Sequence, residues 1–284
     1  MGSALNNNPV ALVTGAAKGL GRRIAEALVA AGYRVALLDV LAGALEQTVQ
    51  DLKASGATVI GIPTDVTDPE QVETAVAQTE QELGAITVLV NNAGTFSTIG
   101  PLWESDPETW FRDIRVNLYG GFLVCRSVVG RMVERRAGYV INMVSSGGVL
   151  DPHPYGTSYA SSKTGMMRLT EGLAKETEDL GIKVFAVGPP AVLTDMTRFL
   201  LEDAGAKKWR PLIGEIFERG EDYPPEIVSD LVLTLLSGRA DKLSGRYFLP
   251  HHDYENMLAN AEDIVEKDLW TLRIRGHQPK RQEN

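Results

Sequence analysis

The sequence is poor in cysteine and in positive charge. Cys125 is the one cysteine among 284 residues, so an internal disulfide is excluded, and the apolar residues around it indicate packing rather than a nucleophile. The net charge is −9, and no basic run interleaved with aromatic residues occurs in the first 270 residues. These features fit a reducing compartment and argue against a general nucleic-acid surface, so we expect no nucleic-acid partner.

Long apolar segments are also missing. No stretch approaches the length of a membrane span, and residues 1–8 have neither the basic nor the apolar region of a secretion signal. We therefore expect a soluble, cytoplasmic protein that has a flexible N-terminus over residues 1–8 and no membrane partner. Nothing in the sequence indicates a metal site.

What the sequence does contain is an alternation of apolar runs with segments of helical periodicity. This rhythm is typical of βαβ units, whose right-handed crossovers produce a parallel sheet covered on both faces. Strands are expected near residues 10–14, 33–39, 57–62, 86–91, 138–144, 182–187 and 245–249, and long helices near 107–135 and 156–180. The predicted fold class is α/β, a doubly wound parallel seven-stranded sheet with helices on both faces.

Two segments depart from this alternation. One domain is expected over residues 9–250, and within it the stretch from about 195 to 224 is expected to form a substrate loop. The second segment is a C-terminal extension over 251–284. Between Tyr254 and Ile274 its apolar residues recur at helical spacing, which predicts a helical tail that buries a stripe on this subunit or on another. Acidic residues in the tail argue against lipid contact, and residues 276–284 are expected to be frayed.

The clearest chemical signal is the pair Tyr159 and Lys163. Their spacing of four residues places a phenol beside an ammonium on a helix. A nearby positive charge favours the phenolate, so a tyrosine whose ordinary pKa is about 10 can become a usable base near neutral pH. Such pairs also arise as ordinary surface contacts, so this interpretation depends on other features of the chain.

One such feature follows the first predicted strand. Residues 14–21, Thr-Gly-Ala-Ala-Lys-Gly-Leu-Gly, lead into a helical stretch from Arg22 to Ala31. Glycines allow the backbone to approach a pyrophosphate closely, and the first turn of the helix offers free N–H groups and the positive end of its dipole. The segment predicts a dinucleotide cradle, and a purely structural β–α turn is the alternative. The cradle residues are Gly15, Lys18, Gly19, Leu20 and Gly21.

Together with Asn91-Asn92-Ala93-Gly94, an isolated Asn117 and the pair Ser145-Ser146, these motifs stand in a recognisable order. TGxxxGxG and YxxxK in this arrangement resemble the single-domain form of the short-chain dehydrogenase/reductase family over roughly residues 9–250. The resemblance implies a Rossmann-like fold and an NAD-dependent oxidoreductase that interconverts a secondary alcohol and a ketone by hydride transfer. It also implies a homodimer or homotetramer.

The resemblance assigns a role to each candidate catalytic residue. Tyr159 is the general acid or base, Lys163 lowers its pKa and holds the nicotinamide ribose, and Asn117 holds a water in a proton relay. A satisfied core asparagine is the alternative for Asn117. The serine that bonds the substrate oxygen is ambiguous, because counting forward along the strand selects Ser145 and counting back from Tyr159 selects Ser146. We favour Ser145, since strand register is rigid whereas the following loop can absorb one residue.

Cofactor preference depends on Asp39, which ends the second predicted strand. A carboxylate there can accept hydrogen bonds from the adenosine ribose and would repel a 2′-phosphate, which favours NAD over NADP. Lys18 favours NADP, and a merely solvated strand end is the alternative for Asp39. Pro190 stands where the family usually has glycine, so the local turn must differ. The resemblance implies further cofactor contacts at Asp65, Val66, Asn92, Ala93, Gly94, Pro189, Val192 and Thr194.

The segments expected to line the substrate pocket are mainly apolar or aromatic, which favours an apolar or aromatic alcohol or ketone. The candidate substrate residues are Phe96, Ser146, His153, Tyr155, Met196 and Phe199. Basic residues between Arg198 and Arg210 offer the alternative of a bound carboxylate, although a charge run on a loop is usually a solvated face. A non-catalytic NAD-binding protein is the remaining alternative, but it would be expected to have lost the tyrosine or the serine.

Overall fold

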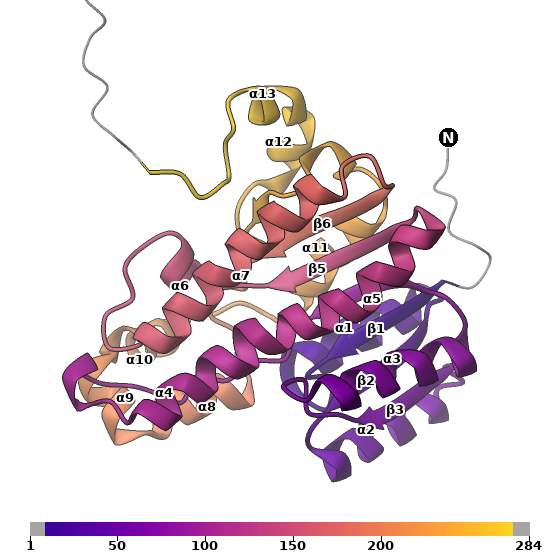
Figure 1. The fold of residues 1–284 in the computed structure, drawn as a ribbon. Helices are drawn as coiled ribbons and strands as arrows, with labels where there is room; N and C mark the ends of the chain where they lie inside the picture. Colours follow the sequence, from indigo (N-terminus) through magenta and orange to yellow (C-terminus); the bar gives the residue numbers. More distant parts are fainter. Residues whose placement is uncertain (1–8, 275–284) are drawn as a thin grey trace, which may run out of the picture.

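The computed structural model describes residues 9–274, so the predictions for 1–8 and 276–284 lie outside the described residues. Within this range the strands form one seven-stranded parallel sheet in the order β3-β2-β1-β4-β5-β6-β7 (Figure 1). The strands are β1 (Val10–Thr14), β2 (Arg34–Asp39), β3 (Val59–Pro63), β4 (Ile86–Asn91), β5 (Gly138–Met143), β6 (Ile182–Val187) and β7 (Tyr247–Phe248). The predicted seven-stranded parallel sheet is confirmed.

The central strands are buried along their whole length because both faces of the sheet are covered. β1, for example, is buried at each of its five positions and pairs in register with β2 on one side and with β4 on the other. The chain passes from β3 back across the sheet to β4, next to β1. The carboxyl ends of β1 and β4 therefore flank the point where strand order reverses, which is where open α/β sheets bind ligands.

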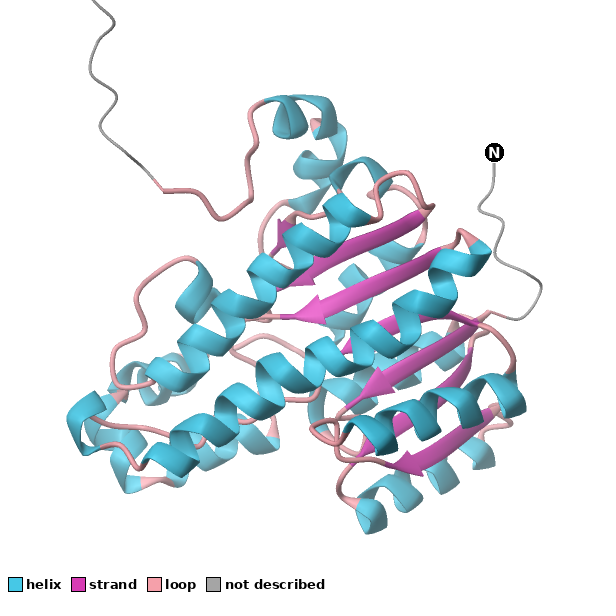
Figure 2. Cartoon of the chain, viewed as in Figure 1, coloured by secondary structure: helices cyan, strands magenta, loops and turns pink. Residues whose placement is uncertain are grey.

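Helices cover the two faces as separate layers (Figure 2). One apolar core contains side chains from the helices α1 (Gly19–Ala30), α2 (Ala42–Ala54) and α11 (Glu226–Leu236). The core on the other face contains side chains from α3 (Pro69–Leu83), α5 (Gly121–Arg135) and α7 (Thr157–Glu176). Short elements complete this part of the chain, namely η1 (Leu102–Glu104), α6 (Ser146–Val149) and η3 (Asp241–Leu243).

The predicted helix over 107–135 is one rod built from three parts. It consists of α4 (Pro107–Ile114), the π-helical η2 (Arg115–Gly120) and α5, and the backbone stays helical through both junctions. Asn117 is buried within the π-helical turn. A π-helical turn is rare and often marks a functional site, because the extra residue changes where its side chains point.

The predicted substrate loop over 195–224 is mostly helical. It forms α8 (Asp195–Glu202), α9 (Ala204–Trp209) and α10 (Pro211–Glu218), which lie together beyond the carboxyl ends of the strands (Figure 1). Side-chain caps explain where α8 and α9 begin, because the Thr194 hydroxyl accepts from the Thr197 N–H and the Asp203 carboxylate accepts from the Ala206 N–H.

The tail is helical only in part. It forms two short helices, α12 (Tyr254–Ala259) and α13 (Ala261–Glu266), which confirms the predicted helical tail. The two helices are separated at Asn260, whose side-chain amide donates to the Asn256 carbonyl and so competes with the backbone. Met257 and Ile264 are buried in the same core as α11, whereas Val265 and Leu269 are exposed. The tail thus buries part of its apolar stripe on its own subunit.

Two further properties concern the described residues alone. Between residues 9 and 274, no helix combines the length and apolar character needed to cross a bilayer. The same range contains no group of three or more His, Cys, Asp or Glu side chains arranged to hold a metal ion. Cys125 is buried, which raises its pKa to about 12, so it packs as an apolar residue.

Candidate active site

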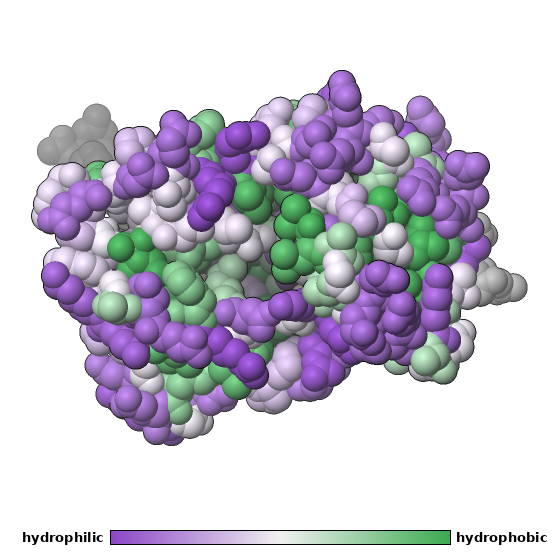
Figure 3. All heavy atoms as spheres, turned by 90° about the horizontal axis from the view of Figure 1, so that it is seen from below, coloured by the Kyte–Doolittle hydropathy of each residue, from purple (hydrophilic) through white to green (hydrophobic). Residues whose placement is uncertain are grey.

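A cavity of about 470 Å³ lies at the carboxyl ends of the strands. On the face seen from below, the molecule is hollowed near its centre, and apolar side chains gather around the hollow (Figure 3). All the predicted cofactor residues except Gly21 and Val192 line this cavity. They are Gly15, Lys18, Gly19, Leu20, Asp39, Asp65, Val66, Asn92, Ala93, Gly94, Tyr159, Lys163, Pro189 and Thr194.

The glycine turn between β1 and α1 has a conformation that demands glycine. Gly15 and Gly19 have φ angles of +63° and +54°, in the left-handed region. A Cβ on Gly21 would lie 2.1 Å from the Gly15 carbonyl oxygen, so Gly21 is required for packing although it does not line the cavity. No side chain caps the N-terminus of α1 within the described residues. The start of α1 thus lacks a side-chain acceptor, and its residues Gly19 and Leu20 line the cavity, which fits the cradle hypothesis.

The segment after β4 is fastened to this turn. The Asn92 side-chain amide donates to the Thr14 and Gly15 carbonyls, each at 3.0 Å, and the Thr14 hydroxyl accepts from the Asn92 and Ala93 N–H groups. These bonds hold two loops that are 77 to 79 residues apart in sequence. The segment is therefore a support for the cavity wall rather than an isolated turn.

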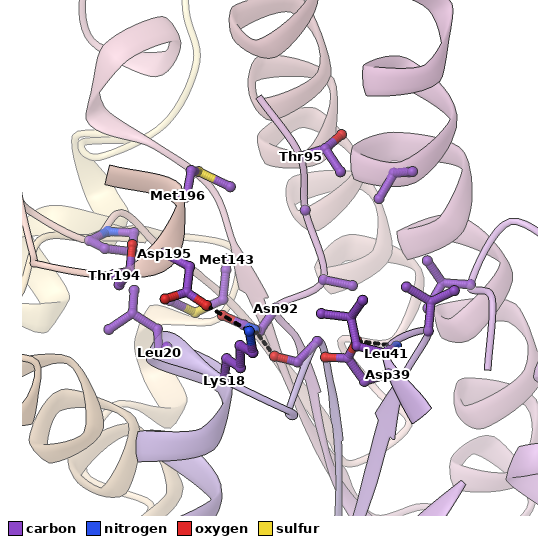
Figure 4. A pocket seen from close by; sticks show the side chains of 18 of the residues that line it. Lys18, Leu20, Asp39, Leu41, Asn92, Thr95, Met143, Thr194, Asp195 and Met196 are labelled. Carbon is purple, nitrogen blue, oxygen red and sulfur yellow. Dashed lines mark hydrogen bonds and ion pairs between the residues drawn. The ribbon is translucent and has the colours of Figure 1, made fainter. Parts of the chain in front are cut away.

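Asp39 is half-buried at the far end of the cavity from the catalytic residues and is not a solvated strand end. Its carboxylate accepts from the Ala17 N–H at 2.9 Å and from the Leu41 N–H at 3.0 Å. Lys18 forms an exposed ion pair with Asp195 at 3.3 Å (Figure 4). This pair connects the glycine turn to α8 and directs the Lys18 ammonium away from Asp39.

The segment after β6 forms another part of the cavity wall. Pro189 and Thr194 line the cavity, while the Val192 side chain is buried in the core and its carbonyl accepts from the Thr197 hydroxyl at 2.8 Å. Val192 also forms a bridge with Tyr223. Asp65 and Val66 line the wall near Asp39, as the family pattern predicts.

Tyr159, Lys163 and Ser145 are brought together by α7 and the end of β5. The Ser145 side chain lies close enough to the Tyr159 phenol to favour a lower pKa of that group, whereas Ser146 has no such effect. The Lys163 ammonium lies 5.7 Å from the centre of the Tyr159 ring and donates to the Met143 carbonyl at 2.9 Å. Ser146 begins the short helix α6 instead.

The electrostatics of this group differ from the prediction. Burial raises the pKa of Tyr159 above its ordinary value; Ser145 and Arg210 oppose this rise, and Asp113 adds to it. Burial also lowers the pKa of Lys163 to about 8. The expected lowering of the tyrosine pKa by Lys163 is therefore not seen, because removal from water outweighs it and the lysine ammonium is directed to a backbone carbonyl.

Asn117 is fully hydrogen-bonded within the protein. Its side-chain oxygen accepts from the Thr95 N–H at 2.7 Å, and its amide donates to the Thr95 carbonyl at 2.9 Å and to the Ser162 hydroxyl at 3.0 Å. The side chain thus matches the satisfied core asparagine. A Cβ on Gly94 would lie 3.2 Å from the Asn117 oxygen and 3.3 Å from the Lys163 nitrogen. Asn117 therefore sits next to the catalytic lysine and positions the segment after β4.

Asp113 performs a similar task that sequence reasoning missed. It is fully buried, and its carboxylate accepts from the Thr95 and Ser158 hydroxyls and from the Ser97 and Thr98 N–H groups. These bonds join α4 to the start of α7 and to the loop that carries Phe96. Its position four residues before Asn117 on the same helical face is the signal that would have found it.

Three aromatic or basic side chains surround the Tyr159 ring on the substrate side. Phe96 stacks on Tyr159 with 4.5 Å between ring centres, and the His153 ring lies 6.1 Å from it. The Arg210 guanidinium lies over Phe96 at 5.6 Å. Sequence reasoning treated Arg210 as part of a solvated charge run, because nothing in the sequence shows that α9 ends over the active site.

Of the remaining candidate substrate residues, one lies in the cavity and two lie elsewhere. Met196 lines the cavity and packs with Phe96. Tyr155 stacks on Trp209 at 4.7 Å instead of facing Tyr159. Phe199 is about half exposed, and its neighbour Leu200 packs into the cluster under Phe96. Phe199 and Tyr155 are thus not brought into the active site in this structure.

Comparison with known proteins places this geometry in a family. A family model described as short chain dehydrogenase matches residues 9–205. The chain is 31% identical over 249 residues to 2-(S)-hydroxypropyl-CoM dehydrogenase 3 of Xanthobacter autotrophicus, covering 87% of this chain and 96% of the relative. It is 35% identical over 198 residues to 5-keto-D-gluconate 5-reductase of Escherichia coli, covering 70% and 77%.

A solved structure agrees with these matches. A single-substitution variant of actinorhodin polyketide ketoreductase, crystallised with NADPH, superposes with a TM-score of 0.78 at 29% identity. The superposition covers 88% of this chain and 97% of that one.

Proposed function

The chain belongs to the short-chain dehydrogenase family, and from that premise we propose that it is an NAD(H)-dependent oxidoreductase that interconverts a secondary alcohol and a ketone. The observation that carries this proposal is that Tyr159 and Lys163 line the same cavity as the glycine turn and Asp39. A proton-transfer group and a dinucleotide cradle thus share one cavity.

The residues present fit a dinucleotide. Left-handed glycines, the uncapped start of α1 and the half-buried Asp39 carboxylate would hold its pyrophosphate and adenosine ribose, and Lys163 would hold the nicotinamide ribose. A bound nicotinamide supplies hydride transfer to or from the carbon that bears the oxygen.

The protein's part in the reaction is proton transfer and orientation. Tyr159 takes the proton of the alcohol as oxidation proceeds and returns it to the ketone oxygen in the reverse direction. Ser145 holds the same oxygen by a hydrogen bond and so fixes the distance to Tyr159. Asn117 keeps Gly94 and the loop beyond it in place beside Lys163.

The preference for NAD over NADP rests on Asp39. Its carboxylate is fixed by two backbone N–H groups, and a 2′-phosphate placed there would meet a negative charge. Lys18, which would favour NADP, is paired with Asp195. The named relatives act on different substrates, so membership of the family does not identify the substrate of this protein. We propose an apolar or aromatic alcohol or ketone, because Phe96 and Met196 pack beside Tyr159.

We further propose a cytoplasmic homodimer or homotetramer. A single buried cysteine supports the reducing compartment, and exposed aromatic side chains along α4, η2 and α5 support self-association.

The test is formation of NADH at 340 nm from NAD⁺ and a panel of secondary alcohols, compared with NADP⁺ and with the Tyr159→Phe variant. We expect NAD⁺-dependent turnover that falls at least about 1,000-fold in Tyr159→Phe while NADH binding is retained. Turnover that survives Tyr159→Phe would contradict the mechanism. NADH binding without turnover of any alcohol or ketone would favour a non-catalytic NAD-binding protein.

A further inference from the structure

Arg210 ends α9 and enters the space beside the catalytic tyrosine from the substrate segment. One terminal nitrogen donates to the Pro154 carbonyl at 2.9 Å, and the other contacts His153 Nδ1 at 3.3 Å. Its guanidinium lies over the Phe96 ring, which in turn stacks on Tyr159. The side chain is therefore fixed in one orientation by a carbonyl, an imidazole and a ring.

The contact with His153 settles where the imidazole proton is. An arginine can only donate, so His153 Nδ1 must accept, and the proton of the neutral ring lies on Nε2. The ring is neutral near pH 7, since burial and Arg210 lower the pKa of His153 to about 4. Both His153 Nε2 and Arg210 Nε are buried and have no acceptor among the described residues. Two N–H donors therefore lie unsatisfied in one cluster.

The charge of this cluster is also uncompensated. No carboxylate between residues 9 and 274 forms an ion pair with Arg210. The basic residue nearest to it in sequence, Lys208, lies over the Trp209 ring. A partly buried guanidinium without an anion is costly, and each unsatisfied buried donor adds to that cost. An anionic acceptor bound beside Arg210 and His153 would neutralise the guanidinium and accept from the unsatisfied N–H donors.

We propose that Arg210 and His153 form a subsite for a carboxylate of the substrate, so that the substrate is a keto acid or hydroxy acid whose apolar part packs against Phe96 and Met196. This inference rests on the proposed function and narrows its substrate class. A carboxylate fits better than a phosphate, because the cluster offers a single planar fork and one positive charge. The subsite also gives a reason for the position of the Arg210 guanidinium near Tyr159, because a substrate whose oxygen binds Tyr159 would bring its carboxylate to Arg210.

Binding is the first test, because it does not depend on turnover. Protein saturated with NAD⁺, the form of the cofactor that cannot reduce a ketone, is titrated calorimetrically with benzoylformate, 3-benzoylpropanoate and 4-benzoylbutyrate, and with the methyl ester of each. We expect at least one acid to bind more tightly than its ester. In Arg210→Met, which keeps the apolar stem over Phe96, the affinity for that acid should fall roughly 30- to 1,000-fold. Lys207→Met, an exposed change on the same helix, is the matched control and should leave the affinity unaltered.

Turnover separates the two proposals. The ratio of kcat/KM for the acid to that for its ester should fall by a similar factor in Arg210→Met, and Arg210→Lys should restore part of it. Binding that depends on Arg210 without turnover of acid or ester would support the subsite and contradict the proposed function. Equal losses for acid and ester, or no acid bound in preference to its ester, would overturn the subsite, because Arg210 would then act only on the loop or on Tyr159.

Discussion

At the scale of the residue, Asp39 is the side chain on which cofactor choice depends. Asp39→Ser keeps an acceptor for the Ala17 and Leu41 N–H groups but removes the negative charge. We expect the ratio of kcat/KM for NADP⁺ to that for NAD⁺ to rise about 10- to 100-fold, which corresponds to about 1.4 to 2.8 kcal/mol. Steady-state kinetics with both cofactors measures this ratio. Lys18→Met, which removes the opposing cation, should lower it, and an unchanged ratio in Asp39→Ser would mean that Asp39 only supports the turn.

Lys163 serves the proposed reaction but lowers the stability of the folded protein. Its pKa falls from 10.5 in the unfolded chain to about 8 in the folded protein, so between these values the unfolded state binds more protons. Stability therefore rises with pH over that window, and the cost of the buried ammonium is fully present below pH 8. From pH 7 to pH 9.5 wild type should gain about 2 kcal/mol of unfolding free energy relative to Lys163→Met.

Urea denaturation of both proteins at the two pH values measures this difference. Lys163→Met should also lose activity, since the ammonium that would hold the nicotinamide ribose is gone. Lys175→Met changes an exposed lysine near the end of the same helix, and its stability relative to wild type should not show the same dependence on pH. A constant difference between wild type and Lys163→Met across the window would show that Lys163 is not held at a lowered pKa.

Some of these residues could be identified from the sequence and some could not. Tyr159, Lys163 and the glycines were found because each belongs to a local pattern in which a few neighbouring residues fix the geometry. The choice of Ser145 over Ser146 was made from the rigid register of β5 and stays a prediction, which the effect of Ser145 on the pKa of Tyr159 supports. Arg210 was missed because its position depends on how three short helices fold over the sheet, and local spacing carries no record of that packing.

At the scale of the element, the loop after β4 is held by helix α4 rather than by its own sequence. Asp113 holds the loop, since its buried carboxylate accepts hydrogen bonds from four groups, of which three belong to the loop and one to α7. Asp113→Asn replaces an acceptor with a donor that faces other donors, and we expect a loss of about 2 to 3 kcal/mol of unfolding free energy with a lower kcat.

Urea unfolding and steady-state kinetics measure the two effects. Asp106→Asn is the matched control, because Asp106 caps the same helix at its exposed start and asparagine caps about as well, so its change should stay within about 0.5 kcal/mol. If Asp113→Asn is as stable as the control, the loop must be held mainly by Asn117.

The strands were more predictable than the helices. Buried parallel strands are continuous apolar runs, so their positions can be read to within a few residues, and the sheet order then follows from the crossover rules. Helical spacing was less reliable. In the tail it predicted helix but not the division at Asn260, and over 107–135 it gave no sign of the π-helical turn at Asn117, whose side chain bonds to Thr95 and Ser162.

At the scale of the whole molecule, the surface along α4, η2 and α5 is the feature that one subunit leaves unexplained. Tyr119 lies eight positions after Phe111, and Phe122 lies three after Tyr119. The three side chains are 52%, 42% and 42% exposed, and the last two stack on each other at 6.1 Å. The tail, in contrast, already buries part of its apolar stripe against its own core. A row of exposed aromatic side chains is costly unless another surface covers it.

We therefore expect the protein to form a homodimer or homotetramer through this helical row. Phe122→Glu places a charge beside Tyr119 at one end of the row and should shift the mass measured by light scattering towards the monomer. Val265→Glu, at an exposed apolar position in the tail, is the contrasting variant, and it should leave the assembly intact. If Val265→Glu dissociates the oligomer and Phe122→Glu does not, then the tail is the interface. A wild-type protein that stays monomeric at micromolar concentration would leave the aromatic row without a partner copy and would contradict the expectation outright.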